Sequence, residues 1–161
     1  MTTVRMQVNG AARELEVAPR DLLLDVLRQS LGLMSVHAAC EQGPCGACTV
    51  LVDGVSVRSC LMFAVQADGA TITTVEGLAQ SGGGMHPVQE AFSDCHALQC
   101  GFCTPAMVLT VVELLERHPE PDRVTIEEAL AGQLCRCTGY ESIVEAVHDA
   151  ARRLGGQEAT T

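Results

Sequence analysis

The first residues of the chain alternate between apolar and polar positions, which is the pattern of a half-buried β-strand. The apolar members of this alternation are Val4, Met6 and Val8, then Leu15 and Val17. Asn9-Gly10 lies between the two runs and has the composition of a two-residue hairpin turn. Asp53-Gly54 divides a later apolar stretch in the same way, and residues 71–75 read as a further strand. The pattern predicts two β-hairpins and a fifth strand.

Helical spacing replaces this alternation in one segment between the hairpins. We expect Asp21 to cap a helix that ends at Gly32. Its apolar positions are Leu23, Val26, Leu27 and Leu31. Strands that flank one helix predict a small α+β domain over residues 1–78.

The second half of the chain is helical in pattern. Pro87 is expected to start one helix, Thr104-Pro105 a second, and a capping box from Thr125 to Glu128 a third. The periodicity of a fourth helix ends at Gly155-Gly156. A glycine-rich stretch over 79–86 has linker composition. We therefore predict a linker there, an all-α domain over 87–154 and a flexible tail over 155–161.

Composition narrows the function classes. A formal net charge of -10 argues against nucleic acid, because phosphates require clustered Lys and Arg. Neither a secretory leader nor an apolar run of about 20 residues is expected from the sequence, which predicts no membrane span. A cytoplasmic protein follows, whose reducing surroundings leave thiols free for metal. Export on the signal of a partner, or association with the inner membrane through a complex, stays open.

Cysteine is the chemically informative residue, and its nine copies form two groups of four with Cys95 left over. The groups are Cys40, Cys45, Cys48 and Cys60, then Cys100, Cys103, Cys135 and Cys137. The first group begins with the C-x4-C-x2-C spacing by which plant-type ferredoxins hold a [2Fe-2S] cluster. We expect Gly43 and Gly46 to let the backbone fold closely around the metal. A tetrahedral zinc site is the alternative.

The second group combines a C-x2-C pair with a C-x-C pair, and this spacing alone does not separate iron–sulfur from zinc. Cys100 and Cys103 precede the N-terminus of the helix predicted from Thr104, where the helix dipole stabilises anions. Cys95 is expected to be a small buried residue and not a ligand.

Three segments carry a specific resemblance. They are Cys40-Glu-Gln-Gly-Pro-Cys-Gly-Ala-Cys-Thr-Val, Gln99-Cys-Gly-Phe-Cys-Thr-Pro and Leu134-Cys-Arg-Cys-Thr-Gly-Tyr. Together they are similar to the iron–sulfur subunit of the molybdenum hydroxylases, the xanthine oxidase family, over about residues 3 to 153. The resemblance implies an α+β fold in which an N-terminal β-grasp, plant-type ferredoxin-like domain precedes an all-α four-helix [2Fe-2S]-binding domain.

The same resemblance implies a division of labour. The eight grouped cysteines would hold two [2Fe-2S] clusters, and Gln99 and Cys137 would approach the pterin of a molybdenum cofactor. That cofactor would lie on a large partner subunit and FAD on a medium one, in a dimer of heterotrimers. This chain would relay electrons between them, with no substrate-turnover site of its own.

Other classes and the substrate remain open at this point. A freestanding two-cluster ferredoxin or redox sensor and a zinc-organised interaction module are the alternatives in other classes. The substrate of a complex could be an N-heterocycle, an aldehyde, carbon monoxide or an aromatic acyl thioester. Ala106 and Gln133 depart from the usual family residues, and we expect them to affect only local packing.

Overall fold

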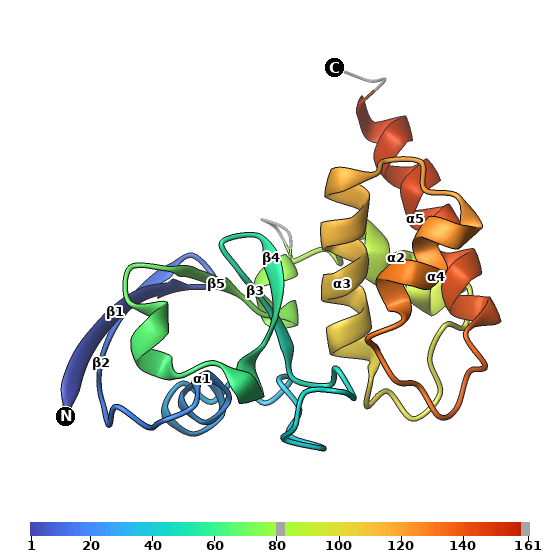
Figure 1. Cartoon of the computed structure of the whole chain (residues 1–161). Coiled ribbons are helices and arrows are strands. Elements are labelled where there is room, and N and C mark those ends of the chain that lie inside the picture. The colour runs from blue at the N-terminus through green and yellow to red at the C-terminus, as the bar shows by residue number, and fades with distance from the viewer. Residues whose placement is uncertain (80–82, 159–161) are drawn as a thin grey trace.

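The structure is a computed structural model that describes residues 1–79 and 83–158. Strands and short helices occupy its first part, called here the sheet region (1–79), and longer helices its second part, the helical region (83–158). The two lie side by side, with the helix Thr104–Arg117 (α3) next to the sheet (Figure 1). Both the fold class and the order of its parts agree with the prediction.

The sheet region contains a five-stranded mixed sheet in the order β2-β1-β5-β3-β4. The strands are β1 (Thr2–Val8), β2 (Ala11–Val17), β3 (Thr49–Val52), β4 (Val55–Arg58) and β5 (Thr71–Thr73). β1 and β5 are parallel, while β1–β2, β3–β4 and β3–β5 are antiparallel. Val8 therefore lies opposite Ala11 across one turn and Val52 opposite Val55 across the other. Both predicted hairpins and the fifth strand are confirmed.

One short helical segment packs beside this sheet, and it differs from the predicted helix. Its α-helical part is only Leu23–Asp25 (α1), and it continues as a π-helix over Val26–Ser30 (η1). Asp21 does not cap it, because the Asp21 carboxylate accepts from the Ala18 amide at 2.7 Å and closes the preceding turn. The prediction of Asp21 as the cap was wrong. A local tight turn provided a nearer donor than the helix did.

Three 3-10 turns complete the sheet region: η2 (Ser59–Leu61), η3 (Ala64–Ala67) and η4 (Val75–Leu78). The turn η2 follows β4 directly, so that Cys60 is brought back toward the loop that precedes β3. No helix in the described parts of the chain is both long and apolar enough to cross a membrane.

Four helices form the helical region: α2 (Pro87–Asp94), α3 (Thr104–Arg117), α4 (Arg123–Leu130) and α5 (Glu141–Glu158). Most of α3 is buried among the others and against the sheet, which explains its nearly continuous apolar sequence. Figure 1 shows α3 between the sheet and the remaining helices. The predicted four-helix arrangement is confirmed.

Two details of these helices differ from the predictions. Asp122 and not Thr125 caps α4, because the Asp122 carboxylate accepts from the Thr125 amide at 2.8 Å. Aspartate is the stronger cap, and it starts the helix earlier than the predicted box. The helix α5 continues through Gly155 and Gly156, where we expected a tail, to Glu158. Glycine lowers helix stability by only about 1 kcal/mol, so it does not by itself end a helix.

Each region has its own hydrophobic core. Buried residues of β1, β3, β5, α1 and η1 form one, and α2 to α5 form the other, which Leu51 of β3 also joins. The predicted boundary at 79–86 stays a prediction, since residues 80–82 of this segment lie outside the described residues.

Candidate functional site

The first cysteine group lies in two places: Cys40, Cys45 and Cys48 in the loop that precedes β3, and Cys60 in η2. The Cys40 and Cys45 thiols are hydrogen-bonded to each other, and the same is true of the Cys48 and Cys60 thiols. Cys48 and Cys60 are buried, whereas Cys40 and Cys45 are partly exposed. The Cys40 sulfur also accepts the Gln42 amide at 3.4 Å. The four thiols thus form two pairs, one inner and one closer to solvent.

Glycine allows this loop to close. Gly43 and Gly46 have φ of 91° and 78°, values that L side chains rarely adopt. A Cβ at Gly46 would overlap the Gln133 side chain and lie 2.5 Å from the Gly132 carbonyl oxygen. One at Gly43 would lie 2.5 Å from Leu61 Cδ1. The backbone therefore approaches Leu61 closely at Gly43 and the helical region closely at Gly46. The expected close approach of both glycines to a metal stays a prediction.

The second group unites two segments of the helical region. Cys100 and Cys103 lie in the loop before α3, and Cys135 and Cys137 lie between α4 and α5. Cys137 Sγ lies 3.5 Å from Cys100 Sγ, and the Cys103 thiol is hydrogen-bonded to that of Cys135. Cys100 and Cys137 are exposed, while Cys103 and Cys135 are partly buried. Again the thiols form an outer and an inner pair.

Tyr140 holds the loop that carries Cys135 in place. Its hydroxyl donates to the Gln133 carbonyl at 2.9 Å and accepts from the Cys135 amide at 2.8 Å. The Thr138 hydroxyl donates to Cys135 Sγ at 3.1 Å and accepts from the Tyr140 amide at 3.2 Å. The C-x-C segment is therefore fixed by side chains that follow it, and no local sequence pattern indicated this role of Tyr140.

The pKa values separate the inner from the outer thiols. The Cys45 thiol and nearby amides donate to Cys40 and lower its pKa to about 7. Burial raises the pKa of Cys60 and of Cys103 to about 12. Burial also acts to raise the pKa of Cys135, but the hydrogen bonds it accepts, that of Thr138 foremost, outweigh burial and lower it. Without a cation the inner thiols Cys60 and Cys103 therefore stay protonated, and a bound metal would supply the charge that ionises them.

This pairwise arrangement bears on the kind of metal site. Two bridged irons, each taking two thiolates, would fit two pairs of thiols. The side chains present thus fit a binuclear cluster in both groups.

The two cysteine groups are joined directly through the backbone. The Leu134 amide donates to the Cys45 carbonyl at 2.9 Å, and Leu134 immediately precedes Cys135. Arg58 of β4 donates to the Gly132 carbonyl at 2.6 Å. The loops of both groups lie along one side of the molecule, the lower side in Figure 1.

Gln133 is the buried polar side chain of this contact, with a relative exposure of 2%. With Nε2 donating to the Gly46 carbonyl at 3.0 Å, its Oε1 accepts from Arg58 at 3.2 Å and from Thr110 at 2.6 Å. This orientation satisfies both ends of the amide. Gln133 therefore connects the two regions, which is more than the local packing role expected from the sequence.

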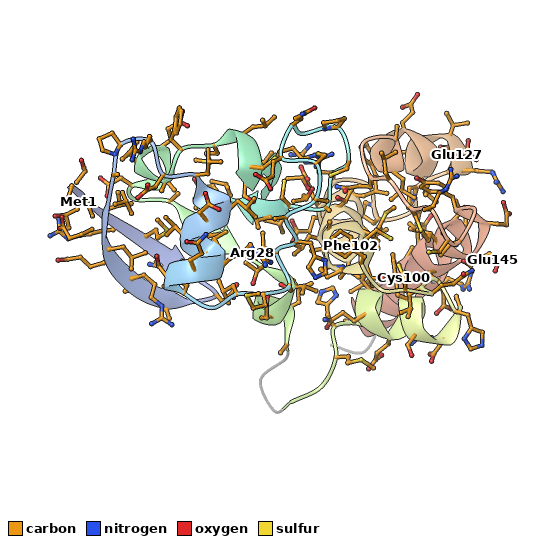
Figure 2. All side chains as sticks on the ribbon, turned by 90° about the horizontal axis from the view of Figure 1, so that it is seen from below. Met1, Arg28, Cys100, Phe102, Glu127 and Glu145 are labelled. Atoms are coloured by element: carbon orange, nitrogen blue, oxygen red, sulfur yellow. The ribbon has the colours of Figure 1, made fainter. Side chains whose placement is uncertain are left out.

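An aromatic contact adds a second connection. The His37 ring stacks on Phe102 with centroids 4.4 Å apart, and His37 Nδ1 donates to the Phe102 carbonyl at 2.7 Å. Phe102 lies between Cys100 and Cys103, and Figure 2 shows it at the boundary of the two regions with Cys100 beside it. Neither residue was a candidate from the sequence, because their contact spans 65 positions.

The remaining predicted residues are placed as follows. Gln99 is exposed and adjoins the exposed Cys100. Cys95 ends α2 and is partly buried against the helical core, where burial raises its pKa.

Comparison with known proteins agrees with this geometry. A family model described as a 2Fe-2S iron-sulfur cluster binding domain matches residues 6–79, and one described as a [2Fe-2S] binding domain matches residues 74–148. The chain is 50% identical to the nicotine 6-hydroxylase small subunit of Paenarthrobacter nicotinovorans, covering 96% of this chain and 92% of that one. It is 46% identical to the nicotinate dehydrogenase small FeS subunit of Eubacterium barkeri, covering 94% and 96% respectively.

A solved structure shows the same fold over the whole length. A chain of quinoline 2-oxidoreductase from Pseudomonas putida 86 matches with a TM-score of 0.92 at 44% identity, covering 99% of this chain and 98% of that one. The two matched [2Fe-2S] domains, the paired thiols and these relatives agree: the chain belongs to the iron–sulfur small subunits of the molybdenum hydroxylases, the xanthine oxidase family.

Proposed function

We propose that this chain relays electrons from a molybdenum cofactor to FAD, each on a partner subunit, through two [2Fe-2S] clusters of its own. The first would be held by Cys40, Cys45, Cys48 and Cys60, and the second by Cys100, Cys103, Cys135 and Cys137. The observation that carries this proposal is the pairing of thiols within each of two domains that match [2Fe-2S] models. When bound, such a cluster accepts and releases one electron at a time.

The exposed thiols indicate where the molybdenum subunit would dock. Cys100 and Cys137 form the outer pair of the second site, and Gln99 is exposed beside them. Leu98, Phe102 and Leu134 of the same loops are 40%, 45% and 58% exposed. A partner that covers these apolar side chains would exclude water from the outer pair. Gln99 and Cys137 would then approach the pterin and form the electron entry port.

The hydrogen bond between the Leu134 amide and the Cys45 carbonyl supports transfer between the two sites. It joins the residue that precedes the proposed ligand Cys135 to the backbone of the proposed ligand Cys45, without a gap through solvent. Gln133 and the stack of His37 on Phe102 hold the domains around this bond. The chain itself would thus fix the distance over which the electron moves.

The medium FAD-binding subunit would receive the electron from the first site. Leu61 and Phe63 follow the buried proposed ligand Cys60 in sequence and are 61% and 46% exposed, so they offer an apolar surface there. We further propose a dimer of heterotrimers in the cytoplasm, with domains at 1–78 and 87–154 and a linker at 79–86. No part of this chain would bind the substrate.

Relatives matched over nearly their whole length suggest a substrate class. The names of three, nicotine 6-hydroxylase, nicotinate dehydrogenase and quinoline 2-oxidoreductase, refer to N-heterocyclic aromatic compounds. We propose that the complex containing this chain also hydroxylates an N-heterocycle. Assay of the purified complex with matched N-heterocycles and aldehydes would test this, and turnover of aldehydes alone would contradict it.

Purification of the native complex tests the main proposal. We expect about four irons and about four acid-labile sulfides per chain, together with molybdenum and FAD in the complex. Stoichiometric zinc without visible charge-transfer absorption would refute the cluster assignment. Two clusters in a chain that purifies without molybdenum or flavin would instead favour a freestanding ferredoxin.

A further inference from the structure

Hydroxyl side chains flank the proposed metal-binding cysteines in both domains, but those of the first domain donate to backbone carbonyls. The Ser59 hydroxyl donates to the Cys48 carbonyl at 2.7 Å, and the Thr49 hydroxyl donates to the Gly46 carbonyl at 2.6 Å. Each hydroxyl has a single proton to donate. Neither is left to donate to a sulfur atom.

Thr138 of the second domain is used differently. Its oxygen accepts the Tyr140 amide at 3.2 Å, and its proton is directed at Cys135 Sγ, 3.1 Å away. The accepted amide bond polarises the hydroxyl and makes it a better donor. The proton therefore goes to a proposed metal ligand and not to the backbone.

Thr104 of the same domain also immediately follows a cysteine, Cys103. Its Oγ1 is buried and has no hydrogen-bond partner within the described residues. Buried hydroxyls without a partner are rare in folded proteins, and each requires an explanation. Thr104 is the first residue of α3 and follows Cys103 directly in the chain. A sulfur atom of a cluster bound at Cys103 would supply the missing acceptor.

We propose that the hydroxyls of Thr104 and Thr138 donate hydrogen bonds to sulfur atoms of the second [2Fe-2S] site and thereby raise its reduction potential. This inference rests on the ligand set of the proposed function. One-electron reduction adds one negative charge, and hydrogen bonds to sulfur stabilise the more negative form. The Thr49 and Ser59 hydroxyls next to ligands of the first site donate to backbone carbonyls. Thr104 and Thr138 therefore act only on the reduction potential of the second site. They would help to set the difference in reduction potential between the two sites, which is the driving force for electron transfer.

The size of the effect follows from the strength of such bonds. Hydrogen bonds to charged acceptors are about twice as strong as neutral ones, and reduction increases the charge on the acceptor. We expect removal of either hydroxyl to lower the equilibrium constant for reducing the second site about threefold to tenfold. A tenfold change corresponds to about 59 mV for a one-electron couple.

Redox titration of the assembled complex tests this directly. Thr104→Val and Thr138→Val remove the hydroxyl at nearly constant volume, and Thr104→Ser and Thr138→Ser keep it. Thr71→Val, at the exposed first residue of β5, is the matched control. Anaerobic reduction with dithionite, followed by EPR, gives the midpoint potential of each cluster separately. We expect the second potential to fall in the valine variants and to return toward wild type in the serine variants, with the first potential unchanged throughout.

Iron and sulfide analysis of the same samples separates failure of this inference from failure of the proposed function. Two intact clusters with an unchanged second potential would overturn the role of the threonines and leave the ligand set standing. A wild-type chain without two [2Fe-2S] clusters would overturn the ligand set itself. If a valine variant does not retain its cluster, the alanine variant at the same position is titrated in its place. An unchanged potential of the second site in that variant would overturn the inference.

Discussion

Replacing Gln133 by Leu should weaken the contact between the two domains while each domain keeps its fold. Gln133 is 2% exposed and connects the Gly46 loop, Arg58 of the sheet and Thr110 of α3. Leucine fills most of the same volume but makes no hydrogen bond. The perturbation is therefore the loss of one buried amide between the loops that carry the two cysteine groups.

The magnitude follows from what the partners of Gln133 retain. Gly46 still accepts from the amide of Thr49 at 2.9 Å and from its hydroxyl at 2.6 Å. Arg58 still donates to two backbone carbonyls, and the single hydroxyl proton of Thr110 can turn to the Ala106 carbonyl of its own helix, 3.0 Å away. No partner is left unsatisfied, so the cost is the net value of three hydrogen bonds at about 0.5–1.5 kcal/mol each. We expect a loss of about 2–3 kcal/mol.

Urea unfolding of the purified holoprotein under anaerobic conditions measures this loss. With an m-value of about 2 kcal/mol/M, the midpoint should fall by about 1 M. Gln133→Asn keeps an amide and should lose less, and Gln7→Leu on the exposed face of β1 is the matched control. A midpoint for Gln133→Leu equal to that of Gln7→Leu would refute the reasoning, because it would show that the buried amide contributes nothing.

Four other variants test the remaining assignments. Cys45→Ser should damage the first cluster and spare the second, as seen by iron content and EPR; loss of both signals would contradict independent sites. Gln99→Ala should leave both EPR signals intact but slow reduction by substrate in stopped flow, whereas an unchanged rate would make Gln99 only structural. Cys95→Ala should cost on the order of 1 kcal/mol or less and leave both clusters in place, and loss of a cluster would show that the ligand set is wrong. His37→Ala should lower stability by about 1 kcal/mol through loss of the stack on Phe102, measured by urea unfolding with His37→Phe as the ring-retaining comparison.

The local sequence pattern was sufficient to predict those elements whose structure depends on residues adjacent in sequence. The hairpins form at Asn9-Gly10 and Asp53-Gly54, where all four residues have positive φ, as the turn chemistry requires. Amphipathic periodicity located the helices of the second domain to within a few residues. It did not determine their caps, because at α4 the competing donors and acceptors lie within one turn of each other.

The sequence by itself determined the chemistry of this protein: which cysteines form two groups of four, which domain type contains each, and the family to which the chain belongs. Only the tertiary structure decided which thiols pair, because Cys137 meets Cys100 across 37 positions and C-x-C spacing does not specify a partner. It also decided how the domains meet, through Gln133, through His37 on Phe102 and through the bond from Leu134 to Cys45. Such contacts join segments far apart in sequence, so no local periodicity records them, and they exist only once both cores have formed.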